Sequence, residues 1–134
     1  RCTSRGLGDV YKRQTIFSFA EGTRNTKKKH ELQDSPYRNL LKPKIGGIAT
    51  ALCAFPEIEY LIDYTLKYKS HKRSFWDFLM GDLSDAKVSV KKYKIPPKLK
   101  NKNYIHDENY RKDFRKWMDE IWIIKDKTID DLKF

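Results

Sequence analysis

The stretch Phe19-Ala20-Glu21-Gly22-Thr23-Arg24 is the point around which the rest of the chain is organised. The residues from Thr15 to Phe19 are rich in β-branched and aromatic side chains, a composition typical of a short buried strand. The polar, lysine-rich residues from Asn25 to Asn39 predict a loop. The sequence therefore places residues 19–24 where a strand opens into a loop, a frequent position for a site in an α/β protein.

The residue types in this stretch suit a phosphate group. Gly22 lets backbone and ligand approach closely because it has no Cβ. Thr23 offers a hydroxyl, and Arg24 offers a planar fork of donors that matches phosphate oxygens. Glu21 cannot bind a phosphate itself, but it could orient Arg24 or bind a substrate hydroxyl. The alternative interpretation is an ordinary strand end with solvated charges.

The hexapeptide resembles Phe-Pro-Glu-Gly-Thr-Arg, the third sequence block of the glycerolipid (lysophosphatidic acid) acyltransferase superfamily. Ala20 stands where that family commonly has Pro. From Thr15 to Leu132 the order of features is similar to the YihG-like and lysocardiolipin acyltransferase-like branch. The resemblance implies an α/β fold, whose visible part is two or three strands of a larger mixed sheet with flanking helices, ending in a long amphipathic helix.

The same resemblance implies a function. It implies an enzyme that transfers an acyl chain from acyl-CoA or acyl carrier protein to the hydroxyl of a lysophospholipid, with no further cofactor. It implies association with an anionic membrane surface at the cytoplasmic face of the inner, or an equivalent, membrane. The residues expected to bind substrate are Glu21, Gly22, Thr23 and Arg24. Lys44 joins them, because it occupies the place of a basic residue that precedes a glycine-bearing helix in the family.

No catalytic residue is assigned in this chain. The family's base is a His followed five positions later by an Asp, and this pattern occurs at none of the histidines, which are followed at that distance by other residues: His30 by Ser35, His71 by Trp76, and His106 by Arg111. The family places its His-Asp block before the Glu-Gly-Thr-Arg block. We therefore expect that block to lie upstream of Thr15 and this part of the protein to be inactive alone.

Residues 1–14 have a different character from the rest. They resemble a translated sequencing-adapter sequence, and a disordered natural tail is the alternative. We therefore interpret residues 15–134 as the C-terminal portion of an acyltransferase domain. Because upstream strands and helices would then be missing, we expect some apolar surface to be exposed.

Four further segments carry clear periodicity. An apolar stripe of Ile45, Ile48, Ala49 and Leu52 predicts a helix after Pro43. Alternating residues predict strands over 59–69 and 87–95. A helix is predicted over 108–132, with Asp107 as its N-cap. Its stripe comprises Tyr110, Phe114, Trp117, Ile121, Ile124 and Thr128.

Charge and composition limit the possible partners. The chain has 134 residues and a formal charge of +11, which favours anionic partners. A small basic module that binds nucleic acid or anionic membranes without catalysis is therefore the alternative function. Nucleic acid is not expected as a partner, because the outer face of the long helix carries charges of both signs. No apolar run approaches the roughly 20 residues that span a bilayer. Two cysteines do not make a Cys-based metal site, and no metal is expected.

Overall fold

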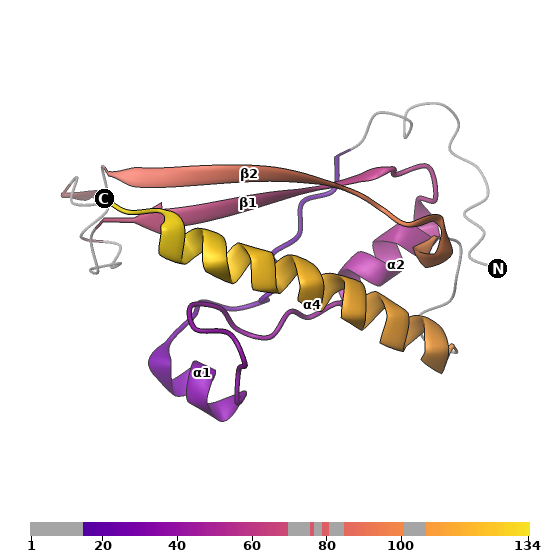
Figure 1. The fold of residues 1–134 in the computed structure, drawn as a ribbon, viewed down its shortest axis with the longest axis horizontal. Coiled ribbons are helices and arrows are strands. Elements are labelled where there is room, and N and C mark those ends of the chain that lie inside the picture. The colour runs from indigo at the N-terminus through magenta and orange to yellow at the C-terminus, as the bar shows by residue number, and fades with distance from the viewer. Residues whose placement is uncertain (1–14, 70–75, 77–78, 81–84, 101–106) are drawn as a thin grey trace.

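A computed structural model describes residues 15–69, 76, 79–80, 85–100 and 107–134 (Figure 1). Residues 1–14, His71 and His106 lie outside these ranges. The elements in chain order are α1 (Lys27–Leu32), α2 (Gly46–Ala54), β1 (Tyr60–Tyr68), β2 (Ala86–Lys94), the 3₁₀ turn η2 (Pro97–Leu99) and α4 (Glu108–Asp131). The described chain is thus a mixed α/β structure that ends in a long helix, which confirms the coarse fold class predicted from the sequence.

β1 and β2 form a two-stranded antiparallel ribbon, and both strands were predicted from their alternating pattern. Tyr64 lies opposite Val90, and Tyr60 lies opposite Lys94. The strand predicted over 15–19 is wrong. This segment belongs to no strand of the described chain, and Phe17 and Phe19 are 82% and 92% exposed. Strand composition does not form a strand without a neighbour for its backbone groups, and β1 and β2 pair only with each other here.

The long C-terminal helix was predicted closely. The Asp107 side chain accepts a hydrogen bond from the Tyr110 N–H and caps the first turn of α4. Figure 1 shows α4 lying beside the ribbon along much of its length. Its stripe differs from the prediction at two positions, because Met118 is fully buried and Ile124 is 42% exposed.

α1 is a short helix inside the segment that was predicted to be a loop. The Thr26 side chain caps it by accepting a hydrogen bond from the Lys29 N–H. None of its residues is buried, so no apolar stripe marks it in the sequence. α2, in contrast, was predicted by its stripe, and Ile45, Ala49 and Leu52 are buried as expected.

The hydrophobic core lies mainly between α4, α2 and the segments around Leu40 and Leu99. Phe114, Met118 and Ala49 are fully buried within it. From the ribbon and its end, Ile95 enters the core, and Leu61 and Tyr93 pack against it. The core therefore depends on loops and helices more than on the sheet.

Where the ribbon faces α4 its inner side chains are polar, whereas its outer face is largely apolar. Asp63 and Thr65 are 8% and 1% exposed on the side towards α4. The outer face presents side chains that are each about half exposed: Tyr60, Ile62, Tyr64, Leu66, Val88 and Val90. This face is the exposed apolar surface that we expected from the sequence.

Candidate functional site

The residues of the hexapeptide form a tight turn rather than the end of a strand. The Gly22 N–H donates a hydrogen bond to the Phe19 carbonyl over 2.8 Å. Gly22 has a φ of +64°, a conformation that costs other residues about 1–2 kcal/mol because Cβ approaches the carbonyl. Glycine at this position is therefore required by the backbone itself.

Lys44 lies directly against this turn. Its N–H donates a hydrogen bond to the Ala20 carbonyl over 2.6 Å. Its side chain passes over Gly22, since a Cβ built on Gly22 would lie 3.0 Å from Lys44 Cδ and 3.3 Å from its Nζ. The structure thus brings together two residues that are 22 positions apart and that the sequence singled out separately. We call Gly22, Thr23, Arg24 and Lys44 the basic corner.

Thr23 and Arg24 follow Gly22 directly and complete the basic corner. The Thr23 hydroxyl accepts a hydrogen bond from Lys29 Nζ, so α1 brings a further ammonium group to the turn. Arg24 is exposed and forms no ion pair with any carboxylate of the described chain. Sequence analysis did not single out Lys29, because the signal, a Thr26 cap that starts a helix, is weak in a lysine-rich stretch.

A shallow hollow lies beside the basic corner, beyond Arg24 in the sequence, and its lining comprises Asn25, Lys27, His30, Glu31 and Arg38. None of the four corner residues lines it. His30 points its Nε2 at the Tyr37 carbonyl over 2.6 Å, which explains its place without a catalytic role.

Glu21 is partly buried, and the groups that act on its carboxyl include the Leu41 backbone and Lys125. Burial raises the pKa of this carboxyl, and the Leu41 N–H and the nearby Lys125 ammonium lower the pKa again by a smaller amount. Glu21 therefore lies close to the segment that leads to Lys44.

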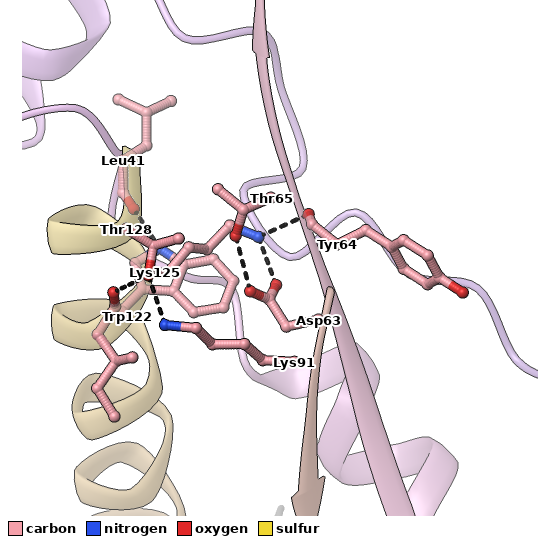
Figure 2. Close-up of polar contacts among 9 residues, drawn as sticks. Leu41, Asp63, Tyr64, Thr65, Lys91, Trp122, Lys125 and Thr128 are labelled. Carbon is pink, nitrogen blue, oxygen red and sulfur yellow. Dashed lines mark hydrogen bonds and ion pairs between the residues drawn. The ribbon is translucent and has the colours of Figure 1, made fainter. Parts of the chain in front are cut away.

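α4 contacts the same segment through Trp122 (Figure 2). The Trp122 indole N–H donates a hydrogen bond to the Leu41 carbonyl over 3.1 Å. Lys125, one turn further along α4, forms an ion pair with Asp63 and donates a hydrogen bond to the Tyr64 carbonyl over 2.9 Å. α4 is thus linked both to the segment that precedes Lys44 and to β1.

A second polar contact joins β2 to α4. Lys91 Nζ donates a hydrogen bond to the Thr128 hydroxyl over 2.6 Å, and that hydroxyl donates in turn to the Ile124 carbonyl over 2.8 Å. On β1, the Thr65 hydroxyl donates to Asp63 over 3.0 Å. Figure 2 shows these side chains between the helix and the strands, with Tyr64 directed away from the helix. Sequence analysis missed this network, because the alternating pattern does not say which face of the ribbon α4 covers.

Comparison with known proteins finds no match for this chain, whether among protein-family models, curated proteins or solved structures. The function must therefore be argued from the geometry and from the motif alone.

Two further properties of the described residues bear on the site. Within these ranges, no group of three or more His, Cys, Asp or Glu side chains is arranged to hold a metal ion. None of the helices described here combines the length and the hydropathy that crossing a bilayer requires.

Proposed function

We propose that the basic corner binds the phosphate of a lysophospholipid, and that the chain belongs to an acyltransferase that esterifies this lipid. The observation that carries the proposal is the contact between Lys44 and Gly22. It places an ammonium group beside a turn whose next two residues, Thr23 and Arg24, carry a hydroxyl and an exposed guanidinium. Together these groups supply the charge-assisted donors that phosphate oxygens accept.

The start of α2 supports the same assignment. α2 begins at Gly46, two residues after Lys44, and no side chain caps its first turn. Such a helix start offers free N–H groups to an anion. An acceptor phosphate held at the basic corner would lie near these groups as well as near Lys44.

The corner supplies binding and orientation for acyl transfer. In the reaction, the lysophospholipid hydroxyl attacks the thioester of acyl-CoA or acyl carrier protein and loses its proton to a base. The resemblance places that base in a His-Asp block that this sequence does not contain. Arg24 and Lys44 would hold the acceptor by its phosphate while the hydroxyl reacts elsewhere.

A titration of lysophosphatidate, below its critical micelle concentration, into the chain tests the proposal. The same lipid without its phosphate, a monoacylglycerol, is the control ligand. We expect Arg24→Ala and Lys44→Ala each to weaken lysophosphatidate binding about tenfold, because each removes a charge-assisted donor. Lys42→Ala is the matched control, since Lys42 is also exposed and is only two residues from Lys44.

The alternative function is a basic module that binds anionic membranes or nucleic acid without catalysis. Three consecutive exposed lysines, Lys27 to Lys29, favour such general attraction. In that case Lys42→Ala and Lys44→Ala would weaken binding equally. The comparison with monoacylglycerol would not separate the two functions. Equal losses at these two lysines, or unchanged binding in Arg24→Ala and Lys44→Ala, would therefore refute the proposed phosphate site.

A further inference from the structure

Two aromatic side chains are exposed immediately before the turn of the basic corner. Phe19 is 92% exposed and Phe17 is 82% exposed, so the described chain covers almost none of either side chain. Phenylalanine is usually buried, because removing its large apolar area from water is favourable. Two phenylalanines exposed this far in one short segment indicate an interaction surface.

The backbone fixes Phe19 at the basic corner. Its carbonyl accepts the hydrogen bond from the Gly22 N–H that closes the turn. Ala20, the next residue, packs against the hydrophobic core, and its carbonyl accepts from the Lys44 N–H over 2.6 Å. The exposed Phe19 side chain therefore projects from a turn that is tied both to the core and to Lys44.

The same turn lies among exposed cations. Arg24 and Lys44 belong to the basic corner, and α1 adds three consecutive exposed lysines, Lys27 to Lys29. Between residues 19 and 31 the only acidic residues are Glu21, which is partly buried, and Glu31. Apolar aromatic groups beside an excess of cations are complementary to an anionic membrane, which offers acyl chains beneath negatively charged headgroups.

We propose that Phe17 and Phe19 enter the apolar layer of an anionic membrane, while the cations of the basic corner and of α1 contact its headgroups. The lysophospholipid is then bound from the membrane, with its phosphate at the corner and its acyl chain in the layer that holds the two phenylalanines. This inference rests on the proposed function. The acyltransferase resemblance implies a membrane, but it does not say which side chains reach it.

The outer face of the ribbon is the competing apolar surface. Its cations are Lys92 and Lys94, at one end of the ribbon opposite Ile62 and Tyr60. The Lys92 ammonium already lies over the Tyr60 ring, 3.7 Å from the ring centroid. Charge therefore favours the corner as the membrane contact. Charge also disfavours a second copy of the chain as the occupant, because packing two corners together brings like charges into contact.

Vesicle flotation tests the inference with the whole chain. The vesicles are phosphatidylcholine alone, or phosphatidylcholine with about a quarter of anionic phosphatidylglycerol. Phe17→Ser with Phe19→Ser is the test variant. Ile62→Ser with Leu66→Ser is the matched control, because it removes two large apolar side chains, each about half exposed, from the outer face of the ribbon.

We expect the phenylalanine variant to bind the anionic vesicles at least about tenfold more weakly than the wild type, because it loses the apolar area that enters the membrane. The ribbon variant is expected to bind as the wild type does. The urea unfolding midpoint of the phenylalanine variant should stay near that of the wild type, since both side chains are exposed.

Three results would overturn the inference. The first is a wild type that does not bind the anionic vesicles, and the second is wild-type vesicle affinity in the phenylalanine variant or an equal loss in the ribbon variant. The third is a wild-type dimer in analytical ultracentrifugation that the phenylalanine substitutions dissociate, because a second copy of the chain would then cover these side chains.

Monomeric lysophosphatidate separates this inference from the proposed function. The phenylalanine variant should bind the dissolved lipid about as well as the wild type does, because the donors of the basic corner remain. An equal loss with the dissolved lipid would mean that the phenylalanines contact the acyl chain and not a membrane, which would also overturn the inference. If Arg24→Ala and Lys44→Ala leave lysophosphatidate affinity unchanged, it is the proposed function that fails, so the two failures are distinguishable.

Discussion

Gly22 is the residue on which the geometry of the basic corner depends most directly. We predict that Gly22→Ala destabilises the chain by about 1–2 kcal/mol, because alanine is strained at a φ of +64°. The added Cβ would also meet Lys44 Cδ at 3.0 Å and push the lysine side chain away. Urea unfolding measures the first effect, and lysophosphatidate affinity measures the second.

Gly47 provides the control for this substitution. It lies in the first turn of α2, and a Cβ added there meets nothing within 4 Å. Gly47→Ala should therefore stabilise the chain by up to about 1 kcal/mol, through helix propensity alone. Similar free energies of unfolding for the two variants would show that the turn at Gly22 is not as described.

Glu21 should give the stability a measurable pH dependence. Burial raises the pKa of its carboxyl above the ordinary value of 4.5. The folded chain then binds this proton more readily than the unfolded chain, so folding loses stability as the pH rises from 4.5 through the raised pKa. Glu21→Gln removes this titration. The free energy of unfolding of the variant, minus that of the wild type, should increase between about pH 4 and pH 7.

Urea unfolding of both proteins at both pH values measures this difference. The other carboxyl groups are common to the two proteins and cancel in the comparison. A difference that stays constant with pH would mean that Glu21 is as well solvated in the folded chain as in the unfolded chain. A residue that serves binding can lower the stability of the fold at neutral pH. Glu21 is expected to behave in this way.

At the scale of single residues, sequence chemistry predicted part of the corner. Gly22 was selected for its chemistry, and Lys44 because it occupies the place of a basic residue in the family that the hexapeptide resembles; the structure brings the two into contact. The place of Glu21 could not be predicted in this way. Its partners Leu41 and Lys125 are 20 and 104 positions away, and only tertiary packing brings them to the turn.

At the scale of elements, periodicity predicted where helices and strands occur better than it predicted which of their faces is covered. α4 and both strands lie close to their expected bounds, because long repeating patterns report local geometry. The pattern does not say which face of a two-stranded ribbon is covered. For β1 the covered face is the polar one, since Asp63 and Thr65 bond to each other and Lys125 reaches Asp63 from α4. If burial of apolar area alone decided, the apolar face of the ribbon would be the covered one. In this structure it is not.

The two short segments beside the motif show the limits of composition. Residues 15–19 have the composition of a strand, yet they form none, because strand formation needs a partner outside the segment. Residues 27–32 have no apolar stripe, yet they form α1, because a threonine cap requires only its own neighbours. Composition therefore predicted a strand that does not form at residues 15–19 and gave no sign of the helix that does form at residues 27–32.

At the scale of the whole molecule, the ribbon divides two environments. Its inner face makes hydrogen bonds and an ion pair with α4, and its outer face leaves six large apolar side chains half exposed. A contiguous apolar face of this kind is unusual on a soluble monomer. The free energy of folding of the described chain must therefore come from the core around α4 and not from the outer face of the ribbon.

Opposite substitutions on the two faces of the ribbon test whether folding depends on the inner face and not on the outer face. Val88→Thr with Val90→Thr makes the outer face more polar with almost no change of shape, and it should alter the free energy of unfolding by no more than about 0.5 kcal/mol. Thr65→Val makes the opposite change on the inner face. It should cost about 2 kcal/mol, because buried Asp63 loses the donor that lies 3.0 Å away. Urea unfolding measures both free energies of unfolding. The fluorescence of a dye that binds exposed apolar surface should fall only in the variant with Val88→Thr and Val90→Thr. If the two valine substitutions cost as much as Thr65→Val, the outer face is packed in solution, and the polar face is not the only one that the fold covers.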